Sequence, residues 1–134
     1  MTANFVHVPI GRDGDVVVAR QKGRELASEV GFSGSDLTII ATAISEIARN
    51  ILSYAEEGEI DLSSVEQAGR SGILVVGRDR GPGIPDIERA MRDGFSTGRS
   101  LGLGLPGAKR LMDEFEIASE PGKGTIVTMK KWLS

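Results

Sequence analysis

The sequence predicts an α+β fold, a two-layer sandwich in which helices cover one face of a mixed, mainly antiparallel sheet. Two helical stretches, the second of them amphipathic, follow a short N-terminal strand, and later extended stretches come in adjacent pairs separated by turns. Adjacent strands joined by short turns form antiparallel hairpins, and the apolar face of a helix needs a sheet or another helix to cover it. The 134 residues suffice for one hydrophobic core, so we expect residues 1–134 to form a single domain.

The N-terminal part predicts a strand followed by a helix. Phe5–Ile10 is short and apolar, and Pro9 favours an edge strand because proline has no N–H to donate to a neighbouring strand. Asp15 is a good N-cap residue. The helix that it begins is expected to reach about Val30, where Gly31 ends it.

A second, longer helix is expected from Ser33 or Ser35 to about Ala55. Its apolar residues recur at intervals of three and four, which predicts one buried stripe along the helix. These residues are Leu37, Ile40, Ile44, Ile47, Ala48 and Ile51.

The middle of the chain predicts a β-hairpin. Glu59–Gln67 alternates loosely between apolar and polar residues, and Ala68–Gly72 is expected to be the connecting loop. Ile73–Val76 is apolar throughout and predicts a buried strand that ends near Asp79.

The C-terminal part predicts two further helices and a second strand pair. Asp86 to Arg92 is expected to be a short helix capped by Asp86, and residues 94–101 a loop without periodicity. A helix from about Leu105 to Asp113 follows, and the strands 115–119 and 125–131 close the chain.

Composition excludes several classes of function. The formal net charge of −3 gives no general attraction to nucleic acid or to an anionic membrane. The chain has no cysteine, and His7 is its only histidine, so thiolate metal sites are excluded and histidine-rich ones are remote. No stretch approaches a membrane span, and residues 1–10 do not resemble a signal peptide. We therefore expect a cytoplasmic protein.

Glu46 and Asn50 stand four residues apart in the second expected helix, so their side chains are neighbours. Both lie roughly 100° to 140° from the centre of the apolar stripe, and ordinary surface residues are therefore one interpretation. The alternative is a metal site, because carboxylate and carboxamide oxygens suit Mg²⁺, which shares its coordination with water and phosphates. A carboxylate in such a site could accept a proton from an attacking hydroxyl.

Asp79 follows an apolar strand and opens a glycine-rich turn that contains Gly81 and Gly83. Aspartate often hydrogen-bonds the backbone of its own turn, so a purely structural role is one interpretation. The alternative is a buried carboxylate that accepts a hydrogen bond from an exocyclic amine, as adenine offers. The glycines would then let the base lie close to the backbone.

A second glycine-rich stretch, Gly102 to Gly107, runs into the expected helix. It matches GxGxxG, but no strand directly precedes it and it lacks a G-K-[ST] ending, which argues against a dinucleotide-binding fingerprint and a P-loop. Glycines at a helix N-terminus still offer N–H groups and the positive end of the helix dipole to phosphate. Residues 94–100 are either a connector or a lid over a γ-phosphate. Thr125, after the 122–124 turn, would supply a hydroxyl near the base.

These blocks, in this order, resemble the motifs of the GHKL ATPase/kinase superfamily, which has the Bergerat nucleotide-binding fold. The similarity extends from about Ser35 to Lys131. The matching motifs are Glu46-x-x-x-Asn50 (N box), Asp79-x-Gly81-x-Gly83 and Gly102-x-Gly104 (glycine boxes), and Gly124-Thr125 (last box).

The resemblance implies that ATP and Mg²⁺ are the cofactors and assigns a role to each motif. Asn50 would hold Mg²⁺, and Glu46 would be the general base on a substrate hydroxyl. Asp79 would bind the adenine amine. The remaining assignments are Gly81 and Gly83 to the base pocket and Gly102 and Gly104 to the phosphates.

Within the superfamily, the chain looks most like the small bacterial anti-sigma-factor serine kinases, and above all like the switch kinase of the stressosome. Such kinases phosphorylate serine or threonine on STAS-domain scaffold proteins and, once released, activate a PP2C-type phosphatase. The first helix, with Arg20 and Arg24, is a candidate partner surface. Two other functions stay open: an anti-sigma factor that sequesters a sigma subunit, and a non-catalytic docking module that binds nucleotide only as a structural ligand.

Overall fold

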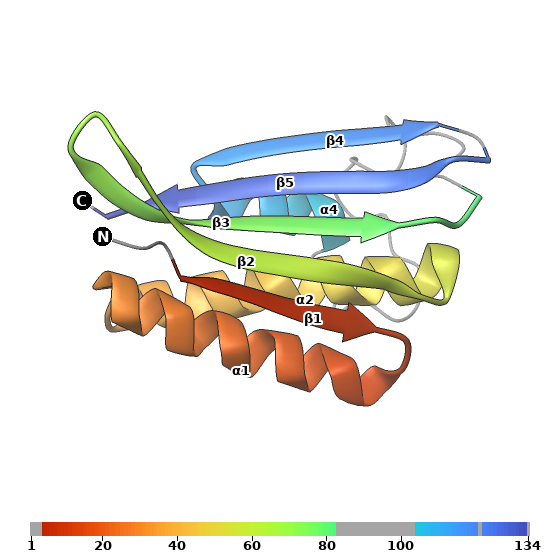
Figure 1. Ribbon diagram of the computed structural model, residues 1–134, viewed down its shortest axis with the longest axis horizontal. Coiled ribbons are helices and arrows are strands. Elements are labelled where there is room, and N and C mark those ends of the chain that lie inside the picture. The colour runs from red at the N-terminus through yellow and green to blue at the C-terminus, as the bar shows by residue number, and fades with distance from the viewer. Residues whose placement is uncertain (1–3, 83–103, 121, 134) are drawn as a thin grey trace.

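The computed structural model describes residues 4–82, 104–120 and 122–133. Five strands within these residues form one sheet in the order β1-β2-β3-β5-β4 (Figure 1). The predicted α+β sandwich is confirmed, and β1 is an edge strand as expected. All neighbouring pairs among the described strands are antiparallel, so this part of the sheet is not mixed. The described elements are β1 (Phe5–Ile10), α1 (Asp13–Val30), α2 (Ser35–Ala55), β2 (Gly58–Gln67), β3 (Arg70–Asp79), α4 (Gly104–Leu111), β4 (Glu114–Glu120) and β5 (Gly124–Trp132).

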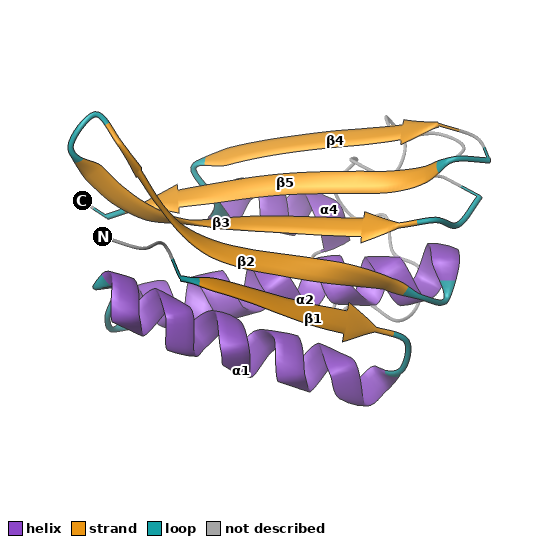
Figure 2. Cartoon of the chain, in the orientation of Figure 1, coloured by secondary structure: helices purple, strands orange, loops and turns teal. Residues whose placement is uncertain are grey.

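The three described helices lie on one face of the sheet, with α2 between α1 and α4 (Figure 2). The expected stripe of α2 packs into a core that includes Ile60 and Val75 of the sheet. Glycines bring the layers close together. A Cβ on Gly77 would lie 2.5 Å from Ile47, and one on Gly23 would lie 2.1 Å from Ile44. Because it contacts the sheet and two helices, α2 has little surface left for solvent.

The start of α1 differs from the expectation. The helix begins at Asp13, and Asp15 is its third residue rather than its N-cap. The Asp15 carboxylate reaches back and accepts hydrogen bonds from the N–H groups of Gly11 (2.9 Å) and Arg12 (3.2 Å). An acidic residue at this position satisfies backbone donors that precede the helix, as in a capping box.

The β2–β3 connection is shorter than expected. Only Ala68 and Gly69 separate the two strands, with φ angles of 52° and 80°. Two successive residues of positive φ are typical of a type I′ turn, whose twist suits a two-residue hairpin. The strand β3 therefore begins at Arg70 instead of Ile73 and pairs with β2 along its whole length.

The predicted helix at residues 86–92 and the predicted loop at 94–101 lie outside the described residues, as do Gly83 and Gly102. The helix expected at 105–113 is confirmed as α4, although it begins at Gly104 and ends at Leu111. In the part of the chain that the structure describes, no helix is long and apolar enough to cross a membrane.

Candidate functional site

The residues Glu46 and Asn50 of α2 are buried, with 2% and 9% of their whole-residue surfaces exposed. This finding overturns the interpretation of both as ordinary surface residues. The reason is the central place of α2, because polar positions beside its apolar stripe also meet neighbouring elements. A buried carboxylate needs partners, and Glu46 has them.

The Glu46 carboxylate connects α2 to the start of α4. Its Oε2 accepts a hydrogen bond from the Gly104 N–H at 2.9 Å, and its Oε1 lies 3.4 Å from Nη1 of Arg49. The backbone of Gly104 adopts a positive φ of 56°, which suits glycine. Its N–H, expected to meet a phosphate, thus donates to Glu46 in this structure.

Asn50 follows Glu46 one helical turn later. Among the described residues, nothing forms a hydrogen bond with its carboxamide. The carboxamide of a buried residue that has no hydrogen-bond partner among the described residues fits the donor chemistry of Mg²⁺, which takes oxygen ligands and completes its shell with water and phosphate oxygens.

Asp79 is the last residue of β3 and is 5% exposed. Its Oδ1 accepts hydrogen bonds from the N–H of Gly81 (3.0 Å) and of Thr125 (3.2 Å). Within the described residues Oδ2 has no hydrogen-bond partner. Desolvation by burial raises the pKa of this carboxyl above its ordinary value of 3.8, although both N–H bonds act against that shift. The two hydrogen bonds to Oδ1 therefore fix the orientation of the side chain.

Two glycines let neighbouring segments approach Asp79. A Cβ on Gly124 would lie 2.1 Å from the carbonyl oxygen of Asp79, and Gly124 has a φ of 87°. A Cβ on Gly81 would lie 2.5 Å from Cβ of Ala55, so the packing of α2 alone explains that glycine. Sequence reasoning expected Gly81 to shape the base pocket, and this role stays a prediction.

Thr125 lies directly opposite Asp79 in the β3–β5 pairing and is 2% exposed. Its Oγ1 lies 2.8 Å from Oγ of Ser119 on β4. The sequence analysis assigned a hydroxyl to Thr125 but missed Ser119 and the Thr125 N–H. The one available signal was the equal spacing of both residues from the 120–124 turn, which makes them cross-strand partners.

The helix α2 joins the two groups of residues. Gly104 meets it at Glu46, and Gly81 meets it at Ala55, about 13 Å further along the helix axis. The structure thus brings together Glu46, Asn50 and Gly104 at one part of α2 and Asp79, Gly81 and Thr125 near its C-terminal end. Such an arrangement separates side chains with the chemistry for metal and phosphate, near Glu46, from a carboxylate with the chemistry for a nucleotide base, at Asp79.

Comparisons with known proteins identify the family of the chain. Residues 12–131 match the family model described as "Histidine kinase-like ATPase domain". The chain is 52% identical over 126 residues to the serine/threonine-protein kinase RsbT of Bacillus subtilis (strain 168), covering 94% of this chain and 95% of that protein. It is 34% identical over 120 residues to the anti-sigma F factor of Thermoanaerobacter sp. (strain X514), covering 86% and 83% of the two chains.

A solved structure with the same fold contains the RsbU and RsbW domains of Rv1364c from Mycobacterium tuberculosis. The TM-score is 0.64 at 21% identity, and the match covers all of this chain and 34% of the other. This similarity supports the fold alone. The relation to RsbT confirms the resemblance to the anti-sigma-factor-type serine/threonine kinases. The chain belongs to the histidine kinase-like ATPase family, in the GHKL group that includes the serine/threonine-protein kinase RsbT and the anti-sigma F factors.

Proposed function

We propose that this protein is an ATP- and Mg²⁺-dependent protein serine/threonine kinase of the cytoplasm that phosphorylates a STAS-domain protein. After release from that substrate, it would bind and activate a PP2C-type phosphatase in a bacterial stress response. The observation that carries the proposal is the buried pair Glu46 and Asn50 on α2, together with Oδ2 of Asp79, which has no hydrogen-bond partner among the described residues. The 52% identity to a serine/threonine kinase supports the same reaction class.

The described residues fit the two cofactors. Asn50 would hold Mg²⁺, because its buried carboxamide has no partner among them. Asp79 would accept a hydrogen bond from the adenine amine through Oδ2, since Oδ1 is already occupied. When bound, the metal ion would supply the charge neutralisation on which phosphoryl transfer mainly depends.

Glu46 would act as the general base on the substrate hydroxyl. Its Oε2 is held by the Gly104 N–H, which fixes the carboxylate against the N-terminus of α4. The hydroxyl would approach the carboxylate on the side of Arg49. Orientation of the nucleophile by a fixed carboxylate is a recognised contribution to kinase catalysis.

Intact-mass spectrometry tests the proposal. A STAS-domain protein is incubated with the kinase, ATP and Mg²⁺, in parallel with the Glu46→Gln variant. We expect the wild type to add one phosphoryl group and the variant, which keeps the size of the side chain, to add none while still binding ATP. Transfer by the variant at the wild-type rate would refute the role of Glu46 as base. Complex formation without transfer by the wild type would favour a docking module.

An anti-sigma factor is the second candidate function, and the 34% identity to an anti-sigma F factor favours it. Such a protein would retain the nucleotide site, but its main function would be to bind and sequester a sigma subunit. Affinity purification from a bacterial extract separates the two. Recovery of a PP2C-type phosphatase supports the switch kinase, and recovery of a sigma factor supports the alternative.

A further inference from the structure

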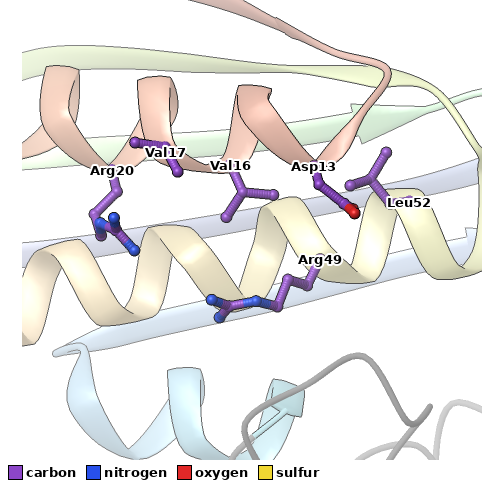
Figure 3. Close-up of a pocket in the computed structure, with 6 residues that line it drawn as sticks. All are labelled: Asp13, Val16, Val17, Arg20, Arg49 and Leu52. Atoms are coloured by element: carbon purple, nitrogen blue, oxygen red, sulfur yellow. The ribbon is translucent and has the colours of Figure 1, made fainter.

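A groove lies between α1 and α2 on the helical side of the molecule (Figure 3). We refer to it as the α1–α2 groove. It encloses about 290 Å³. Its described lining consists of Asp13, Val16, Val17, Arg20, Arg49 and Leu52.

The groove is polarised along its length. Figure 3 shows Arg20 at one end and Asp13 at the other, with Val16 and Val17 between them, and the guanidinium of Arg49 extends toward the Arg20 end. Arg20 has no ion pair within the described residues. Two guanidinium groups beside apolar side chains match a ligand that carries a carboxylate next to an apolar group, because arginine binds carboxylates through its planar fork.

Arg49 belongs both to this groove and to the environment of Glu46. Its side chain is 20% exposed and that of Glu46 is 1% exposed, and their charged atoms are 3.4 Å apart. Charge-assisted hydrogen bonds of good geometry are about 2.7–2.9 Å long, so the contact of Arg49 with Glu46 is a loose one. A carboxylate placed in the groove would compete for the same guanidinium.

We propose that Arg49 is a positioning residue that couples the α1–α2 groove to the Glu46 carboxylate. An acidic segment of a partner protein, bound in the groove by Arg20 and Arg49, draws Arg49 away from Oε1 of Glu46. Glu46 then loses its ion pair with Arg49, which alters the carboxylate proposed as the general base, while Oε2 keeps its hydrogen bond from the Gly104 N–H. The consequence for catalysis rests on the proposed function of Glu46, whereas the movement of Arg49 does not.

The test is an NMR titration of the whole protein, labelled with ¹³C at glutamate Cδ and with ¹⁵N. The Glu46 signal is assigned with Glu46→Gln. Two probes are used: a short Glu/Leu peptide and a Gln/Leu peptide of the same length. We expect the Glu/Leu peptide to move the side-chain Nε signals of Arg20 and Arg49 and the Cδ signal of Glu46, and the Gln/Leu peptide to move none of them.

Three variants sharpen the result. Arg49→Gln should abolish the response of the Glu46 signal to the Glu/Leu peptide. Arg20→Gln should raise the dissociation constant of that peptide about fivefold. Lys22→Gln, a matched change at an exposed residue of α1 paired with Glu25, should alter neither. Equal binding of the two peptides, or an unmoved Glu46 signal on saturation with the acidic one, would overturn the inference.

This experiment separates the inference from the proposed function. If the peptide shifts the Glu46 signal but the protein transfers no phosphoryl group, the proposed kinase function is rejected and the coupling through Arg49 is kept. Phosphoryl transfer with an unmoved signal would reject the coupling alone. Inorganic phosphate is the further probe, and a response to phosphate equal to that of the peptide would reject an acidic peptide segment as the occupant.

Discussion

Replacing Asp79 with asparagine should weaken nucleotide binding without weakening the fold. Oδ1 of Asp79 accepts two backbone hydrogen bonds, from Gly81 and Thr125. Only the oxygen of an asparagine side chain can accept them, so its amide group must replace Oδ2. An N–H₂ group would then face the amine of the adenine, and donor would meet donor.

The magnitude follows from the lost interaction. A hydrogen bond to a charged group contributes about 1.5–3 kcal/mol, which corresponds to a loss of about tenfold to a hundredfold in affinity. The free energy of unfolding of the nucleotide-free protein should rise in the same variant. Burial raises the pKa of Asp79, so the ionised carboxylate is unfavourable in the folded protein at neutral pH, and the neutral amide removes that cost.

Isothermal titration calorimetry with ATP and Mg²⁺ measures the affinity, and thermal unfolding of the nucleotide-free protein measures stability. Asp61→Asn is the matched control. Asp61 lies on β2 and pairs with His7 at 2.6 Å and with Arg78, so its replacement should leave nucleotide affinity unchanged. An unaltered dissociation constant for Asp79→Asn would rule out the adenine role, and a large fall in melting temperature would show that the carboxylate is mainly structural.

Three further predictions concern pH, the glycine turn and the metal. Burial raises the pKa of Asp79 in the folded protein above 3.8, so the protonated carboxyl is the form that favours folding. This stabilisation is fully present below pH 3.8 and is lost as pH rises through the folded pKa. Nucleotide affinity should rise through the same window, and denaturant titrations and binding curves across pH, with Asp79→Asn as control, should show these opposite trends. Gly124→Ala should destabilise the fold by more than about 3 kcal/mol, because it adds a clash 2.1 Å from the Asp79 carbonyl to the cost of a positive φ. Gly122→Ala, at a φ of 79° in open space, should cost only about 1 kcal/mol, and equal urea midpoints for the two variants would contradict the close approach. Asn50→Ala should remove the dependence of ATP affinity on Mg²⁺ while metal-free binding persists, and a variant that still responds to Mg²⁺ in calorimetry like the wild type would exclude Asn50 as the ligand.

Local sequence patterns were enough to predict most of the fold. The periodicity of α2, the turn residues and the paired extended stretches depend on neighbours within a few positions, and these determine helix and strand. The same holds for the spacing of Glu46 and Asn50, which makes them neighbours on any helix. Boundaries were less accurate, as with Asp15 and the turn at Ala68, because capping and turn geometry depend on which backbone donors are satisfied.

The tertiary structure alone decided how the site is held together. Residues 46 and 104 are 58 positions apart, and residues 79 and 125 are 46 apart, yet each pair shares a hydrogen bond. Helical periodicity gives the direction of one apolar face, and it cannot show that α2 is enclosed by a sheet and two other helices. That enclosure explains the burial of Glu46 and Asn50. The strand register explains why Oδ1 of Asp79 accepts the hydrogen bond from Thr125. The sequence by itself thus determined which residues are candidates for the chemistry, and only the packing of distant segments decided which of their atoms are held by hydrogen bonds from the backbone.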